Sequence, residues 1–138
     1  MKKAFSLLIA GVSAAAAVTI TTATPAAADT CMSGADKGGY ELYFNSNQSS
    51  AWQGWAWNDP SFGDDYFMCR GNGSGYTQIV KNNAAYVVNW NNSSSVRIYY
   101  NSNYQGAYQT FGKVFSSSYA GPLNSTLKNN NASAQYVS

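Results

Sequence analysis

The chain has 138 residues, a length typical of one small domain, and its formal net charge is only +2. Histidine is absent, which excludes Ser-His and Cys-His nucleophile pairs and removes the most common general base and transition-metal ligand. Because Lys2 and Lys3 belong to a leader segment, the rest of the chain is formally neutral, and this argues against binding to nucleic acids or anionic membranes.

The first 28 residues have the pattern of a signal peptide. Lys2 and Lys3 form a basic start, an apolar stretch runs from Ala4 to Ile20, and small residues up to Ala28 form a cleavage site. A transmembrane anchor is the alternative, but Gly, Ser and Thr interrupt the apolar stretch and no basic cluster follows it. We therefore expect cleavage after Ala28, secretion of residues 29–138 to the extracellular space, and no membrane attachment afterwards.

Cys31 and Cys69 are the two cysteines of the chain. In an exported protein the default expectation is a disulfide, here closing a long loop and stabilising the fold by about 3–4 kcal/mol. A reactive cysteine is the alternative, but no histidine is present to activate it.

Short aromatic-rich or alternating segments follow one another along the exported part of the chain, with Asn, Gly and Ser between them. They span residues 40–44, 52–57, 66–69, 76–80, 84–90, 96–100, 107–111, 113–115 and 133–137. Short strands separated by turn residues are typical of a β-sandwich or barrel. No segment shows a sustained helical period flanked by caps, so we predict an all-β domain with little helix.

The sequence also contains an internal repeat. Three segments recur: LYFNSN at 42–47 as IYYNSN at 98–103, WQG at 52–54 as YQG at 104–106, and KNNAAYV at 81–87 as KNNNASAQYV at 128–137. The repeat divides the domain, residues 29–138, into a first motif at about 38–90 and a second at about 96–138.

The second motif resembles a known family. Tyr99, Tyr104 and Gly106 match the aromatic, aromatic, glycine signature of the βγ-crystallin Greek-key motif. The resemblance implies a hairpin that folds back, a positive φ at the glycine, and aromatic rings packed over the turn as a corner.

In the first motif the same corner is expected at Phe44, Trp52 and Gly54, where a four-residue insertion alters the spacing. The resemblance therefore implies two Greek-key motifs that form a βγ-crystallin-like sandwich.

The leader, the early cysteine, the two hairpins and the two Asn-rich closing segments make the whole chain similar to the peptidase inhibitor family I36, small secreted bacterial proteins with a crystallin-like fold. The family usually opens with Cys-x-Leu-Tyr, whereas Cys31 here lies farther from Leu42. This resemblance implies a monomeric inhibitor of an extracellular peptidase of unknown class, with no catalytic residues and no cofactor.

The expected contact residues lie where an apolar run meets a glycine-rich loop: Phe67, Met68, Cys69 and Arg70. A loop held at one end by a disulfide is rigid, and rigidity lowers the entropy lost when the loop fills a peptidase cleft. The alternative is an ordinary hairpin connection.

Calcium binding is a second possibility, since βγ-crystallin motifs often bind it through Asn/Asp-Asn/Asp-x-x-Ser/Thr-Ser. The matching segments begin at Asn82-Asn83 and Asn129-Asn130. Tyr86 and Val87 replace both hydroxyls in one segment and Ala134 replaces the last in the other, beside the remaining Ser133. Plain turns and no metal site are therefore predicted.

Glycan binding is a third possibility. On an extended strand Trp55 and Trp57 would share one face and could stack against sugar rings, although core packing competes for the same rings. Asp59, Asp64 and Asp65 are interpreted as a solvated turn, which makes no glycosidase pair unless the fold brings Asp59 opposite the other two.

Overall fold

A computed structural model describes residues 30–138, so the expected signal peptide lies outside the described residues. The elements are α1 (Gly34–Lys37), β1 (Tyr40–Tyr43), β2 (Trp52–Trp55), β3 (Tyr86–Asn89), β4 (Ser95–Asn101), β5 (Gln105–Phe111), β6 (Ala120–Pro122) and β7 (Ser133–Val137). Among residues 30–138, no helix has the length and apolar character needed to span a bilayer.

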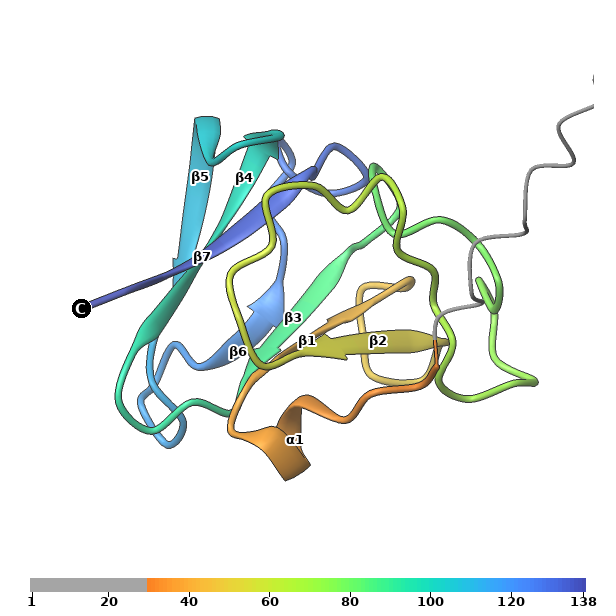
Figure 1. The fold of residues 1–138 in the computed structure, drawn as a ribbon, viewed down its shortest axis with the longest axis horizontal. Coiled ribbons are helices and arrows are strands. Elements are labelled where there is room, and N and C mark those ends of the chain that lie inside the picture. The colour runs from red at the N-terminus through yellow and green to blue at the C-terminus, as the bar shows by residue number, and fades with distance from the viewer. Residues whose placement is uncertain (1–29) are drawn as a thin grey trace, which may run out of the picture.

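The strands form two antiparallel sheets, with orders β2-β1-β3-β6 and β5-β4-β7 (Figure 1). The motifs exchange segments. β6 of the second motif pairs with β3 of the first, while Asp59 of the first motif pairs with Ala134 in β7 through two hydrogen bonds of 2.8 Å. The prediction of an all-β domain with little helix is therefore confirmed.

The core lies between the sheets and follows the side-chain alternation of the strands. In β4, Val96 and Ile98 are fully buried, and Arg97 between them points outward over the Tyr108 ring, with its guanidinium 4.5 Å from the ring centroid. Strand β1 is buried on both faces, because the outer face is covered by a polar cluster around Glu41. The Glu41 carboxylate accepts hydrogen bonds from Tyr43 (2.7 Å) and from the Trp90 indole (2.9 Å).

Three of the expected strands do not form. Segments 66–69 and 76–80 make only isolated bridges, and 113–115 is a turn. Arg70, Thr77 and Phe115 have left-handed backbone with φ between 61° and 67°, which interrupts extended structure at or next to these segments.

Two elements were not expected. The helix α1 is a single turn. Ser33 caps its N-terminus with a hydroxyl that accepts from the Asp36 N–H (3.3 Å), and Gly38 caps its C-terminus with φ of 62°. Strand β6 has only three residues and ends in Pro122 at a sheet edge, where the missing N–H costs no ladder bond.

The internal repeat is also a structural repeat. The Ala85 N–H donates to the Tyr43 carbonyl (2.8 Å), and in the second motif the Ala132 N–H donates to the Tyr99 carbonyl (2.9 Å). The closing turns are linked reciprocally. Asn82 N–H donates to the carbonyl of residue 131 (2.8 Å), and Asn129 N–H donates to that of residue 84 (3.0 Å). The two Asn-rich turns therefore face each other across a pseudo-twofold axis.

Candidate functional site

The hairpin corners differ between the motifs. In the second motif the rings of Tyr99 and Tyr104 lie 6.1 Å apart, and Gly106 has φ of 82°. In the first motif the Trp52 ring lies 5.9 Å from Tyr43. This corrects the expected corner, because Tyr43 occupies the place assigned to Phe44.

Phe44 instead turns toward the core, where its ring contacts Phe67 edge-on at 5.8 Å. Gly54 does not have the positive φ of Gly106. A β-carbon at Gly54 would lie 2.5 Å from the Met32 carbonyl oxygen, so glycine is required there by the close approach of the N-terminal segment.

The disulfide between Cys31 and Cys69 is formed, with the two Cα atoms 4.7 Å apart. Of the four expected contact residues, Phe67 and Cys69 are buried, at 0% and 1% exposure. These two residues cannot enter a peptidase cleft without unfolding, which corrects the sequence-based assignment. Met68 is half-buried and Arg70 is exposed.

Residues 70–77 form an exposed but well-tethered loop. The Phe67 N–H donates to the carbonyl of residue 78 (3.0 Å) at the base of the loop, and the Ala51 N–H donates to the Ser74 carbonyl (3.0 Å) near its middle. The Arg70 guanidinium donates to the Gln48 carbonyl (2.8 Å). This loop and the neighbouring β1–β2 hairpin tip are therefore held together as one unit.

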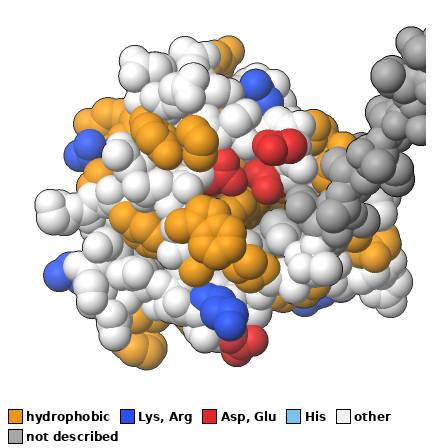
Figure 2. Space-filling view, in the orientation of Figure 1, with side chains coloured by type: hydrophobic (Ala, Val, Ile, Leu, Met, Phe, Trp, Pro, Cys, Tyr) orange, Lys and Arg blue, Asp and Glu red, His pale blue; other side chains and the backbone are white. Residues whose placement is uncertain are grey.

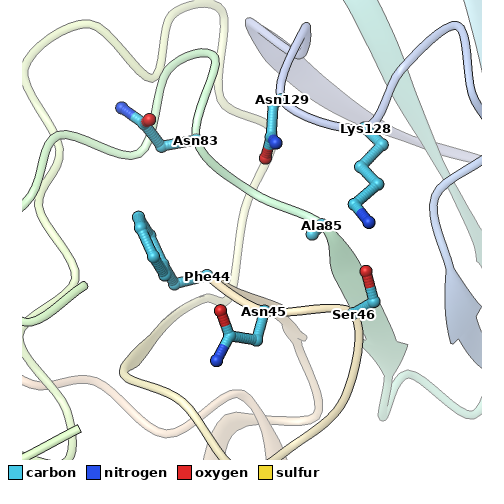
Figure 3. A pocket seen from close by; sticks show the side chains of 7 residues that line it. All are labelled: Phe44, Asn45, Ser46, Asn83, Ala85, Lys128 and Asn129. Atoms are coloured by element: carbon cyan, nitrogen blue, oxygen red, sulfur yellow. The ribbon is translucent and has the colours of Figure 1, made fainter. Parts of the chain in front are cut away.

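A cavity of about 310 Å³ lies between the first hairpin and the two Asn-rich turns (Figure 3). Its lining residues are Phe44, Asn45, Ser46, Asn83, Ala85, Lys128 and Asn129. In Figure 3 the side chains of Lys128 and Ser46 point toward each other across the cavity, and the Phe44 ring stands on the opposite side. At the pseudo-equivalent position Lys81 donates to the Ser102 hydroxyl (3.2 Å).

This arrangement places an ammonium group at each Asn-rich turn, where a bound cation would be repelled. Amide and hydroxyl oxygens without carboxylates are in any case weak ligands for a hard cation. In residues 30–138, no group of three or more His, Cys, Asp or Glu side chains could hold a metal ion. Sequence reasoning missed Ser46 and Lys128, although the repeat pairs them with Ser102 and Lys81.

The tryptophans do not form the expected two-ring platform. Trp55 is 3% exposed and stacks on Tyr40 at 5.3 Å, whereas Trp57 lies beyond the end of β2 and is 56% exposed. Both still line a smaller pocket of about 130 Å³ together with Gln53, Asp59 and Asp65. Figure 2 shows acidic side chains beside hydrophobic ones near the centre of one face of the molecule.

The fold does bring Asp59 to Asp65, and the expectation that all three aspartates are solvated is wrong for Asp59, which is 8% exposed. Burial raises the pKa of the Asp59 carboxyl above its ordinary value of 3.8, against the opposing effect of hydrogen bonds with Asp65, Ser61 and Trp55. The Ser61 N–H bond is 2.8 Å long. The carboxyls of Asp59 and Asp65 are thus joined by a hydrogen bond and line the same pocket as Trp57.

Stability should therefore fall as pH rises through the folded-state pKa of Asp59. The folded state holds this proton more tightly than the unfolded chain, so the stabilisation is complete below pH 3.8 and is lost above the raised pKa. Asp59→Asn should remove this contribution while its amide oxygen still accepts from Ser61. Thermal unfolding of both proteins from pH 4 to pH 8 measures the difference, and parallel curves would contradict the expectation.

The fold is similar to two solved βγ-crystallin structures. One is the crystal structure of a βγ-crystallin domain from Flavobacterium johnsoniae, with a TM-score of 0.50, 15% identity, and coverage of 72% of this chain and 93% of that chain. The other, from work on the evolution of the eye lens βγ-crystallin domain fold, has a TM-score of 0.51, 13% identity, and coverage of 82% and 92%. No family model and no curated protein matches the sequence. From residue 30 onward, the chain has a βγ-crystallin-like fold.

Proposed function

We propose that this domain is a secreted, non-catalytic inhibitor of an extracellular endopeptidase, and that it acts as a monomer by occluding the cleft with the loop 70–77. The observation that carries the proposal is the tethering of this exposed loop. The disulfide holds Cys69 at the start of the loop, and hydrogen bonds from Ala51 and Phe67 hold its middle and base. A loop ordered before binding loses little entropy when a partner closes over it.

Arg70 is the side chain of this loop best suited to anchor a partner. It is exposed and is the only charged residue in 70–77. One guanidinium nitrogen is committed to the Gln48 carbonyl, which fixes the direction of the side chain and leaves other N–H groups for a partner. A guanidinium recognises a carboxylate through two parallel hydrogen bonds, so the best-matched target has an acidic specificity pocket and cleaves after arginine.

Glycan binding receives less support than inhibition. Flat binding of a sugar chain to adjacent rings needs both tryptophans on the surface, and Trp55 is buried in the core. Trp57 alone offers one exposed ring beside an acidic pocket.

Arg70→Gly tests the proposal because Arg70 has φ of 61°, which glycine adopts easily. The variant loses the bond to Gln48 but keeps the backbone bonds from Ala51 and Phe67 that hold the loop. We expect inhibition of trypsin to weaken at least tenfold, equivalent to about 1.4 kcal/mol. The matched control is Lys37→Ala, which removes an exposed cation from α1 and should leave the inhibition constant unchanged.

The readout is the inhibition constant of trypsin, with a metallo-endopeptidase assayed in parallel. Full activity of both enzymes at micromolar wild-type protein would overturn the proposed inhibition through the loop 70–77. Equal inhibition by the wild type and Arg70→Gly would overturn the role of the loop.

A further inference from the structure

Phe115 combines two unusual properties. Its side chain is 92% exposed, more than any other large hydrophobic residue described, and its backbone is left-handed with φ of 67°. The Ser116 N–H donates to the Lys113 carbonyl (3.0 Å) and closes a tight turn around Val114 and Phe115. A positive φ at the third position of such a turn favours glycine or asparagine.

Nothing in the described fold compensates for phenylalanine at this position. A bulky residue with positive φ is strained, and a ring that is 92% exposed gains almost no free energy from burial. Glycine would make the same turn without strain and without an exposed ring. Strain of this kind is concentrated at functional sites, so Phe115 is better explained by a partner than by folding.

The support beneath the ring is rigid. Asn89, which is fully buried, donates through its side-chain amide to the Gly112 carbonyl (2.8 Å) and through its backbone to the Tyr119 carbonyl (2.8 Å). The Gly112 N–H also donates to the Ser118 carbonyl (3.0 Å). Both ends of the turn are therefore fixed to β3, and the backbone that carries the ring is held in place.

The Phe115 turn and the Arg70 loop lie at opposite ends of the four-stranded sheet. Asn89 pairs with Tyr40 at the start of β1, while the Arg70 loop is bonded to residues 48 and 51, beyond the end of β1. In Figure 1 the light-blue turn is at the lower left and the green loop is at the lower right. The two features therefore form separate surfaces.

We propose that Phe115 is the anchor of a second inhibitory surface, whose ring enters the specificity pocket of an endopeptidase that cleaves after aromatic residues. A single ring on a narrow turn fits a pocket one side chain wide. It does not fit a flat interface or a membrane, which needs a broader apolar face, and the neighbouring Lys113 and Ser117 are exposed and polar. Buried aromatic anchors supply much of the affinity of protein interfaces.

This inference rests on the proposed inhibitor function, because it takes the partner to be a peptidase. The site on the domain and the residue type that the peptidase recognises differ from those proposed for the Arg70 loop. The domain would then engage one enzyme through Arg70 and another through Phe115. The left-handed backbone at Phe115 also departs from an extended strand, so the bound turn should resist cleavage.

The test compares wild type, Phe115→Gly and Arg70→Gly against chymotrypsin and trypsin. Phe115→Gly should weaken chymotrypsin inhibition at least tenfold, leave trypsin inhibition unchanged, and keep or raise the melting temperature. Tyr100→Ser, which removes an exposed ring elsewhere on the surface (43% exposed), should change neither inhibition constant.

Each outcome separates this inference from the proposed function. Inhibition of trypsin without inhibition of chymotrypsin would overturn the role of Phe115 and leave that of the Arg70 loop intact. Inhibition of chymotrypsin without inhibition of trypsin would overturn the role of the Arg70 loop and leave that of Phe115 intact. A melting temperature several degrees lower in Phe115→Gly would show that the ring supports the fold, and would overturn the inference even if inhibition fell.

Discussion

Replacing Trp55 with alanine should lower the free energy of unfolding more than any other substitution considered for this domain, whereas replacing Trp57 should leave stability almost unchanged. The Trp55 ring is 3% exposed and lies 5.3 Å from both Tyr40 and Phe62. Removal of a buried tryptophan costs about 3–5 kcal/mol, a large part of the roughly 5–15 kcal/mol that stabilises a small domain. The Trp57 ring is 56% exposed and contributes little to the core.

Urea denaturation of Trp55→Ala, Trp55→Phe and Trp57→Ala measures the difference. The phenylalanine variant should fall between the wild type and the alanine variant, because it keeps a ring against Tyr40 but loses the indole hydrogen bond to Asp59. Equal midpoints for Trp55→Ala and Trp57→Ala would show that Trp55 is not part of the core.

Removal of the disulfide should have the second-largest effect. It joins residues 38 positions apart, and opening a loop of this length should cost about 3–4 kcal/mol, because the unfolded chain gains conformational freedom. The double variant Cys31→Ala/Cys69→Ala should therefore unfold at clearly lower urea concentration. Alanine is preferred to serine at the buried Cys69, where a hydroxyl would lack a partner.

The same bond also fixes the proposed inhibitory loop. Cys69 exchanges backbone hydrogen bonds with Trp52 (2.9 and 3.3 Å), so the loop should stay attached but become more mobile, and trypsin inhibition should weaken along with stability. A reducing agent should shift the unfolding midpoint of the wild type and not that of the double variant. Detection of two free thiols by alkylation without reductant would contradict both expectations.

The elements that sequence reasoning located correctly are those with a local signal. The segment 133–137 matches β7, and segments 40–44 and 84–90 contain β1 and β3, because aromatic and β-branched residues favour extended backbone. The segments 66–69 and 76–80 have the same local composition but face each other across a loop with left-handed residues at Arg70 and Thr77. Propensity does not reveal that break.

The candidate sites depend on contacts between distant parts of the chain, which a single sequence does not specify. Asp59 is buried where its backbone pairs with Ala134 of the second sheet. Trp55 and Trp57 were expected on one face because they are two residues apart, but β2 ends at Trp55. Phe115 was assigned to a strand, and its positive φ has no signature in the sequence.

The exchange of segments between the motifs also sets the order in which the chain can fold. The first sheet is complete only when Ala120–Pro122 has paired with β3, and the second needs β7 at residues 133–137. Each sheet is completed only by a strand near the C-terminus, β6 in the first sheet and β7 in the second, so almost the whole chain must be synthesised before stable structure forms. Pairings between such distant residues make folding slow. The nascent chain should therefore remain unfolded throughout synthesis. An unfolded chain is what a narrow protein-conducting channel can accept.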